Sequence, residues 1–394
     1  MPLLPVLVIL ILNILIDLYI WRCVCRRVRT NVRRWSIATL SFAGFGLMLI
    51  AAAVVWPKRG GSDSSLQCVM WILYAYLTIY IPKFVFVLFD LCARIPELFG
   101  KGRARWLSAC GLVAGALIFI ALWWGALINR FNINVVKTEI EFESLPAVFD
   151  GLTIVQISDL HVGTYGHDTD YLDRVVDTIN ALHPDIILFT GDIVNRRSDE
   201  LVPFVSTLSR LEAPLGVYSV LGNHDYGDYM DWKDDREKAE SFNRLLEMQK
   251  AMGWKMLNNA TEFLYAGNDS IALVGVENVG DPPFKVYGDL RTSYPGDLGD
   301  GVFKILMSHN PAHWNDEIRD SDENIALTLS GHTHAMQIEA FGISPAALRY
   351  PTWGGRYDDE KGHTLYVNIG IGAVGMPMRI GATPEITFIT LRKK

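Results

Sequence analysis

The sequence lacks cysteine in its later part and histidine in its earlier part. All five cysteines lie at or before Cys110, and all nine histidines lie at or after His161, in a chain of 394 residues. The later part therefore has no disulfide and no thiolate metal ligand. The early cysteines lie in or beside apolar segments, and the spacing of Cys23 and Cys25 matches no common zinc pattern, so we assign them to packing or lipidation.

Acidic residues are scarce in the first 130 residues and abundant afterwards. Residues 1–130 contain 14 Lys and Arg but four Asp and Glu, a net charge of +10, whereas the rest contain 22 and 39, a net charge of −17. This asymmetry excludes a single uniform globular domain, and a hydrophobic content of 50% excludes disorder. The acidic part does not favour nucleic acid, because phosphate backbones attract basic surfaces. Divalent cations could still supply positive charge for phosphate chemistry.

Long apolar runs are confined to the first part of the chain. A helix that spans a bilayer needs about 20 mostly apolar residues, and Trp and Tyr gather near its ends. We therefore predict a membrane domain of four transmembrane helices over residues 1–130. Buried helices of a soluble core are disfavoured, because the runs have no polar face. The four stretches are Leu3–Trp21, Trp35–Trp56, Leu66–Leu91 and Trp106–Ile128.

Basic residues in the loops predict the orientation of these helices. The loops 22–34 and 92–105 contain ten Lys and Arg, whereas the opposite side has four. Loops rich in Lys and Arg stay in the cytoplasm. We therefore expect a multi-pass protein of the cell (inner) membrane, with everything after residue 130 on the periplasmic or extracellular side.

The third stretch contains ionisable residues. Lys83 follows Pro82 near its middle, and Asp90 lies seven residues later, about two helical turns away. An ionisable residue at this depth is a functional candidate, here for a lipid headgroup or a substrate phosphate. The alternative is a kinked helix in which the lysine reaches the interface or pairs with Asp90.

After residue 150 the pattern changes to short β-rich runs that alternate with helical patterns, clearest over Tyr171–Leu182 and Asp234–Met252. Strands that are apolar throughout are typical of a sheet covered on both faces. We predict an α/β domain over residues 150–394, with residues 131–149 as a linker or first strand. The expected strands are Leu152–Ile157, Asp185–Phe189, Gly216–Leu221, Ile271–Val276, Phe303–Met307, Ile325–Leu329, Thr364–Ile369 and Ile386–Leu391.

Polar residues follow five of these strands. Because ligands bind at the carboxyl ends of strands in open α/β sheets, we expect these side chains to converge. Each run alone could be a turn or a cap, but five in succession favour a site. Carboxylate, imidazole and amide donors without thiolate suit two divalent ions such as Mn²⁺, Fe²⁺ or Zn²⁺. The runs are Ser158-Asp159-Leu160-His161, Gly191-Asp192, Gly222-Asn223-His224-Asp225, Ser308-His309 and Gly331-His332-Thr333-His334.

In this order the five runs resemble the motifs of the calcineurin-like metallophosphoesterase superfamily. The likeness covers about residues 150–392 and is greatest to its exported or membrane-anchored bacterial branch, through the stretch from Asp150 to His161. It implies a β-sandwich flanked by helices, with a dimetal site at one edge and Asp192 as the bridge between the ions. It assigns Asp159, His161, Asp192 and His334 to one ion, and Asp192, Asn223, His309 and His332 to the other.

The resemblance also implies a mechanism. A metal-activated hydroxide attacks the phosphorus, and His224, beside the ligand Asn223, protonates the leaving oxygen as general acid. Asp225 could orient His224, although adjacent residues rarely bond ring to carboxylate. Arg379 matches a family arginine and could grip a phosphate, or form a surface salt bridge instead. The aromatic segment Leu348–Lys361 could cover the site, touch the membrane or be a plain loop.

We therefore expect a membrane-anchored, metal-dependent phosphoesterase that hydrolyses a phosphoester or diphosphate bond. Four spans exceed what anchoring requires, which favours a lipid-linked or membrane-proximal substrate at the lipid bilayer. One alternative is a pyrophosphatase that cleaves a UDP-linked acyl sugar, although such a substrate is cytoplasmic. The other is a non-catalytic, metal-binding membrane sensor, although all seven ligand positions are filled.

Overall fold

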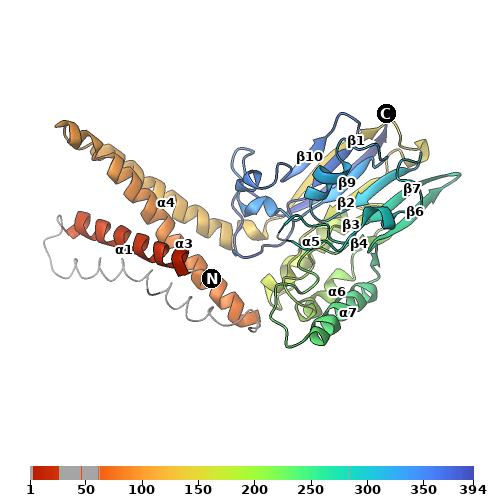
Figure 1. The fold of residues 1–394 in the computed structure, drawn as a ribbon, viewed down its shortest axis with the longest axis horizontal. Coiled ribbons are helices and arrows are strands. Elements are labelled where there is room, and N and C mark those ends of the chain that lie inside the picture. Colours follow the sequence, from red (N-terminus) through yellow and green to blue (C-terminus); the bar gives the residue numbers. More distant parts are fainter. Residues whose placement is uncertain (1–2, 26–45, 47–60, 62, 283) are drawn as a thin grey trace. The chain divides into compact units, whose positions relative to one another are not determined.

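The computed structural model describes residues 3–25, 46, 61, 63–282 and 284–394 (Figure 1). The chain forms two compact units. One comprises Met1–Leu127 with Gly375–Met378, and the other comprises Ile128–Val374 with Arg379–Lys394. We call them the helical unit and the catalytic unit.

The helical unit contains α1 (Leu3–Cys25), α3 (Asp63–Cys92) and α4 (Arg105–Leu127). Within the described residues, the segments Asp63–Phe99 and Arg105–Phe131 are long and apolar enough to cross a membrane. Three of the four predicted stretches are thus helical. The remaining one, Trp35–Trp56, lies outside the described residues apart from residue 46.

Small residues of α4 allow it to pack closely on α3. A Cβ added at Gly111 would lie 2.5 Å from Phe89 Cβ, and one added at Gly115 would lie 3.0 Å from the carbonyl oxygen of Pro82. Such small residues let helix backbones approach where the surrounding lipid offers no hydrophobic driving force.

The ionisable residues of α3 are paired differently from the suggested Lys83–Asp90 contact. Lys83 Nζ lies 2.8 Å from Asp17 Oδ1 of α1, and Tyr80 donates to the other oxygen of Asp17. Asp90 instead accepts a hydrogen bond from Tyr19 and pairs with Arg94 and Arg103, which lie between α3 and α4. The suggested alternative of a Lys83–Asp90 pair is wrong, because α1 supplies the carboxylate of Asp17 to Lys83.

The catalytic unit is built on two six-stranded mixed sheets. Their strand orders are β1-β12-β2-β3-β4-β5 and β10-β11-β9-β8-β7-β6. The strands are β1 (Asn134–Phe142), β2 (Thr153–Ile157), β3 (Ile186–Phe189), β4 (Val217–Ser219), β5 (Lys255–Met256), β6 (Ala260–Ala266), β7 (Asp269–Gly275), β8 (Phe303–Met307), β9 (Leu327–Ser330), β10 (Gly355–Asp358), β11 (Thr364–Val367) and β12 (Glu385–Lys393).

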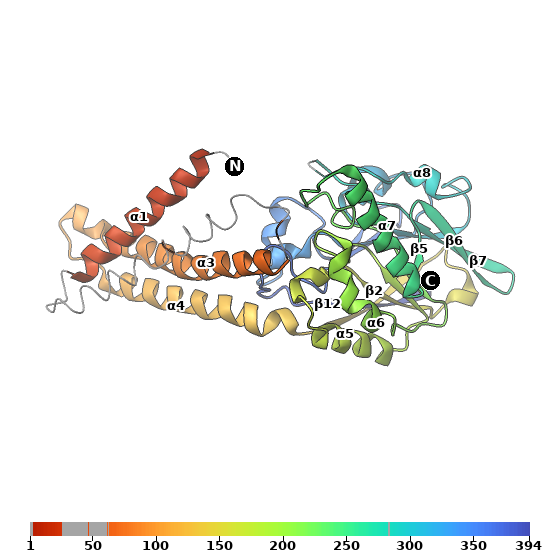
Figure 2. The ribbon, with the colours of Figure 1, turned by 90° about the horizontal axis from the view of Figure 1, so that it is seen from below.

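The two sheets enclose the main hydrophobic core, which contains Ile154 and Leu188 of one sheet and Leu273 and Ile305 of the other. A second core covers the outer face of the first sheet, and Figure 2 shows the helices that lie there. The expected sandwich flanked by helices is confirmed. The helices of this unit are α5 (Asp170–Ala181), α6 (Val205–Leu208), α7 (Asp235–Ala251) and α8 (Leu290–Ser293).

The strand order places the five polar runs at one edge. Strands β2, β3 and β4 are adjacent and parallel in the first sheet, and β8 and β9 are adjacent and parallel in the second. The ends of β2, β3 and β4 therefore lie together in one sheet, and those of β8 and β9 lie together in the other. The predicted site residues follow these ends, and the contact between Asn223 and His309 joins the two sets.

Candidate metal centre

The backbone at this edge is strained. The described residues include twelve non-glycine residues with positive φ, and five of them are predicted metal ligands. Non-glycine residues avoid the left-handed region at a cost of roughly 1–2 kcal/mol each, and such strain is concentrated at functional sites. The five φ values are 53° at Asp159, 43° at His161, 62° at Asp192, 72° at His332 and 49° at His334.

One group of donor atoms comes from β2 and β9. His161 Nε2 lies 3.0 Å from His334 Nε2, and Asp159 Oδ1 lies 3.2 Å from the same nitrogen of His334. Asp159 also accepts a hydrogen bond at Oδ2 from the backbone N–H of His332. The loops after β2 and β9 are thus joined at the donor group itself.

A second group comes from β4, β8 and β9. His309 Nε2 lies 3.2 Å from Asn223 Oδ1 and 3.3 Å from His332 Nδ1. The side-chain amide of Asn223 donates to the Tyr229 hydroxyl, which fixes its carbonyl oxygen toward the histidines. An amide oxygen and two imidazole nitrogens therefore converge.

Asp192 lies between the two groups. Its Oδ2 is 3.6 Å from His161 Nε2 and 3.2 Å from His309 Nε2. Its Oδ1 accepts a 2.8 Å hydrogen bond from the backbone N–H of His224, which holds the carboxylate in this orientation. A single carboxylate oxygen thus faces both donor groups.

Outer hydrogen bonds fix two imidazole rings. His309 Nδ1 donates to the carbonyl oxygen of Thr190 at 2.8 Å, so Nε2 is left facing the site. His332 instead turns Nδ1 toward the site, because its Nε2 lies 3.0 Å from the Tyr350 hydroxyl. Such partners set the tautomer and the ring orientation of metal-binding histidines.

Arg379 is fully buried and cannot grip a phosphate or form a surface salt bridge. Its guanidinium donates to the carbonyl oxygens of Gly372, Ala382 and Ile369 at 2.7, 3.1 and 2.9 Å. Its Nη2 also lies 3.1 Å from His334 Nδ1. Both roles suggested by the sequence are wrong, because the chain between β11 and β12 closes around this side chain.

The ionisation of the site follows from burial and proximity. The neighbouring histidines overcome burial at Asp159 and Asp192 and hold their pKa values below the usual range. Burial keeps the pKa of His161 well below its usual value and, together with His309, lowers the pKa of His332 to about 3. At His309 the effect of Asp192 outweighs burial and raises the pKa to about 9. A bound cation would displace the proton of His309.

This donor set fits metal ions. Asp159 Oδ1, which faces this donor group, is buried without a hydrogen-bond partner, whereas buried polar atoms are normally paired. Two buried carboxylates also require positive charge. Oxygen and imidazole donors without thiolate match borderline divalent ions. The described residues that could hold a metal ion fall into three groups: Asp159, His161 and His334; His161, Asp192 and His224; and Asp192, His309 and His332.

Asp225 ties two of the site loops together, a role that the sequence did not indicate. The carboxylate accepts hydrogen bonds from the backbone N–H groups of Asp192, Ile193 and Gly222, each at 2.9 Å, and from that of Val194 at 3.3 Å. Burial and the charge of Asp192 raise the pKa of Asp225 to about 7, although the backbone donors favour its ionised form. The loops after β3 and β4 thus share one anchor.

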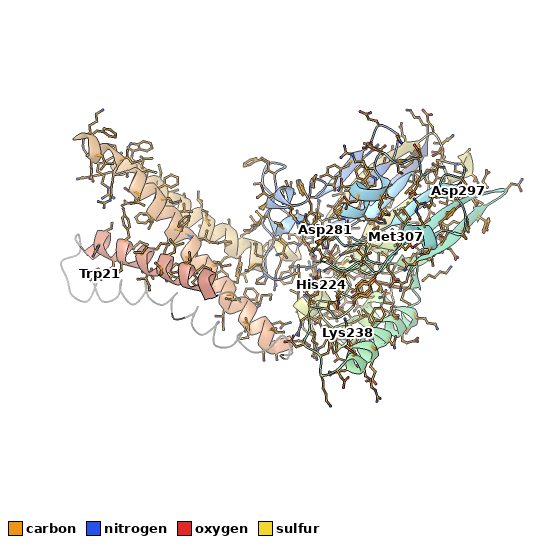
Figure 3. All side chains as sticks on the ribbon, in the orientation of Figure 1. Trp21, His224, Lys238, Asp281, Asp297 and Met307 are labelled. Carbon is orange, nitrogen blue, oxygen red and sulfur yellow. The ribbon has the colours of Figure 1, made fainter. Side chains whose placement is uncertain are left out.

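His224, which is labelled in Figure 3, is half-buried and lies beside the donors His161 and Asp192. Its Nδ1 donates to the carbonyl oxygen of Asn195 at 2.6 Å, and its ring stacks on Tyr229 at 4.2 Å between centroids. Asn195, not Asp225, therefore orients the ring. The nearby His161 ring, 4.8 Å away, makes a metal-binding role for His224 geometrically possible as well.

Three aromatic side chains lie beside the donors. Two of them were missed in the sequence analysis, and the third was named only as part of a longer segment. Tyr229 contacts Asn223 and His224, and Phe284 packs edge-on against His332 with 4.9 Å between ring centroids. No motif marks either residue. Tyr350 belongs to the aromatic segment Leu348–Lys361, and its hydroxyl lies 3.0 Å from His332 Nε2.

Two family models divide the chain near residue 130. The 4TM_phosphoesterase model, described as "Probable Calcineurin-like phosphoesterase, transmembrane domain", matches residues 3–130. The model described as "Calcineurin-like phosphoesterase" matches residues 152–336, which include all seven donors. A Bacillus subtilis protein, "Uncharacterized metallophosphoesterase YkuE", is 31% identical over 306 residues, covering 75% of this chain and 96% of that protein. The chain belongs to the calcineurin-like metallophosphoesterase family. The members use a dimetal centre, and the chain is a membrane protein with a metallophosphoesterase domain.

Other metallophosphoesterases match this chain over nearly its whole length. A Danio rerio "Transmembrane protein with metallophosphoesterase domain" is 28% identical, covering 96% of this chain and 86% of that protein. A Campylobacter jejuni metallophosphoesterase is 24% identical and covers 98% of both chains. The match therefore extends over the helical part as well as the catalytic part.

Proposed function

We propose that this metallophosphoesterase hydrolyses a phosphoester or diphosphate bond at two divalent metal ions held by the seven donors. The observation that carries the proposal is the position of Asp192 Oδ2, within 3.6 Å of His161 and 3.2 Å of His309. A carboxylate in that position can bridge two ions. In the proposed arrangement Asp159, His161, Asp192 and His334 hold one ion, and Asp192, Asn223, His309 and His332 hold the other.

The ions would polarise the phosphoryl oxygens and lower the pKa of an attacking water. The chain itself contributes rigidity. Hydrogen bonds to the outer nitrogens of His309 and His332 hold their rings in place, and the shared anchor Asp225 holds Asp192. Little reorganisation is then needed when substrate binds.

His224 is proposed as the general acid. Its Nδ1–H is engaged by the Asn195 carbonyl, so a second proton on Nε2 is available for transfer. An imidazole suits this task because its ordinary pKa, about 6.5, lies near working pH. The leaving oxygen would receive the Nε2 proton as its bond to phosphorus breaks.

We also propose that the catalytic unit acts outside the cytoplasm on a lipid-linked or membrane-proximal substrate. Ten basic residues in the loops 22–34 and 92–105 support that orientation. The apolar helices support a substrate at the bilayer. A reporter fused after residue 394 tests the orientation: alkaline phosphatase activity is expected, and a reporter that works only in the cytoplasm would reverse it.

Hydrolysis by the full-length protein tests the catalytic proposal. The protein is stripped of metal in detergent, resupplied with Mn²⁺ and assayed with bis-p-nitrophenyl phosphate and p-nitrophenyl phosphate. We expect metal-dependent cleavage that Asp192→Asn abolishes and that Asp199→Asn, at a half-exposed surface ion pair, leaves unchanged. No cleavage of either compound by the folded, metal-loaded protein would count against a general phosphoesterase and favour a binding role.

A further inference from the structure

The segment 335–348 carries apolar side chains that nothing in the described structure covers. Phe341 is fully exposed, Leu348 is 93% exposed and Ile343 is 71% exposed. Met336 is also exposed. The segment contains a single charged residue, Glu339. Single exposed apolar residues are common on protein surfaces, but a cluster of large ones on one short segment marks an interaction site.

The backbone at the tip of this segment makes the exposed phenylalanine more unusual. Phe341 and Gly342 have φ values of 55° and 74° and form a two-residue hairpin turn. Reciprocal hydrogen bonds of 2.9 and 3.0 Å between Ala340 and Ile343 close this turn. Such a turn, with two positive φ values, prefers Asn-Gly. A bulky residue there is strained and gains no packing in return, so its presence requires another explanation.

The segment is held in a defined position. The backbone N–H of Glu339 donates to Ile380 at 2.8 Å, and that of Ile380 donates to Gln337 at 2.8 Å. Ser344 Oγ donates to the carbonyl oxygen of Ala335 at 2.6 Å. The apolar tips are therefore presented by an ordered frame, and their exposure is a property of the folded unit.

We propose that the segment 335–348 inserts Phe341, Ile343 and Leu348 into the interface of the lipid bilayer. The apolar helices of the same chain keep a bilayer within reach. Separate apolar tips on a nearly uncharged segment suit lipid, which adapts to their shape, whereas a protein partner needs a complementary surface.

This insertion would bring the metal centre to headgroup level. His334 immediately precedes the segment, and Tyr350, which contacts His332, follows it closely. This consequence rests on the proposed function, whereas the lipid contact itself does not.

Photo-cross-linking of the full-length protein tests the contact. The cross-linking amino acid p-benzoylphenylalanine replaces Phe341, and the protein is reconstituted in nanodiscs of phosphatidylethanolamine and phosphatidylglycerol. The matched control replaces Tyr265 on β6, which is 77% exposed in the same unit. We expect lipid adducts, identified by mass, in several-fold higher yield at position 341. Equal yields, or adducts formed mainly with protein, would overturn the proposal.

A second variant separates lipid contact from folding. Phe341→Asn installs the residue that this turn prefers, so the fold is expected to be retained. With the cross-linker at Leu348, this substitution should lower the yield of lipid adducts severalfold, whereas an unchanged yield would overturn the role of the hairpin tip. Hydrolysis of bis-p-nitrophenyl phosphate, which is soluble, should not change. If the parent protein itself does not hydrolyse this compound, the proposed function is contradicted, but the result on lipid contact is unaffected.

Discussion

At the scale of single residues, hydrogen bonds outside the donor groups determine how each imidazole can bind a metal ion. The Thr190 carbonyl oxygen accepts a hydrogen bond from the Nδ1–H of His309, and the Tyr350 hydroxyl lies beside Nε2 of His332. The two rings consequently turn different nitrogens toward the same point, Nε2 in one and Nδ1 in the other. Both rings are oriented before a cation binds.

The first prediction separates proton transfer from metal binding. His224→Ala should lower turnover by roughly 10²–10⁴-fold, the usual contribution of a general acid, while metal content stays at the parent level. Asp192→Asn should lose metal and activity together. Turnover and metal content are measured on the same preparations. Metal loss in His224→Ala as complete as that in Asp192→Asn would identify His224 as a ligand, a role that its position beside His161 and Asp192 permits.

The second prediction concerns Glu385, which is buried and accepts hydrogen bonds from Tyr366 and Thr387. Burial raises its pKa despite these donors and the nearby Arg379. A raised carboxyl pKa stabilises the fold at acid pH, below the ordinary value, and this contribution is lost as pH rises through the raised value. Between about pH 5 and about pH 8, the thermal stability of Glu385→Gln should therefore decline less than that of the parent.

Thermal unfolding of the full-length protein in detergent provides the measurement for Glu385. The control is Glu141→Gln, on an exposed position of β1, which should follow the pH profile of the parent. Parallel profiles for Glu385→Gln and the parent would show that the carboxyl group of Glu385 does not titrate differently in the folded protein.

At the scale of elements, the carboxylate of Asp225 joins the loops that follow β3 and β4. Asp225→Asn replaces one acceptor oxygen by an amide donor, which would face backbone N–H groups. We expect the affinity for Mn²⁺ to fall by roughly 10–100-fold, as is typical when a partner of a metal ligand is lost. The free energy of unfolding should fall by about 1–3 kcal/mol.

Isothermal titration with Mn²⁺ and denaturant unfolding test this third prediction. Asp199→Asn serves as the matched control, because its carboxylate is half-exposed and pairs with Arg244 at the surface. If Asp225→Asn binds Mn²⁺ as tightly as this control does, the two loops do not depend on their shared anchor.

The elements also show which parts of the fold follow from sequence pattern. Strands β2, β3, β8 and β9 are buried along almost their whole length, and continuous apolar runs predicted all four. The strands β6 and β10 escaped prediction because they lie at sheet edges and are largely exposed or half-buried. These two strands need no continuous apolar run, because contacts with the neighbouring strand of the sheet stabilise them.

At the scale of the whole molecule, the same reasoning explains what could be predicted of the site. The seven donors follow strand ends, so the sequence indicated that they converge, and the structure brings them together. The burial of Arg379 could not be predicted, because it depends on how the loop between β11 and β12 folds around the side chain. The pairing of Lys83 with Asp17 could not be predicted either, because Asp17 lies on a different helix. The local sequence pattern thus indicates which chemical groups the site contains. Tertiary contacts decide which partners the long side chains, such as those of Arg379 and Lys83, bind.

Metal stoichiometry and hydrolysis measured in one titration test the central claim most directly. The full-length protein is stripped of metal and titrated with Mn²⁺, and bound metal and cleavage of bis-p-nitrophenyl phosphate are measured on the same samples. The account predicts two ions per chain, activity that rises with the second ion, and neither full loading nor activity in Asp192→Asn. Full activity with one ion per chain, or two ions and full activity in Asp192→Asn, would contradict a centre bridged by this carboxylate.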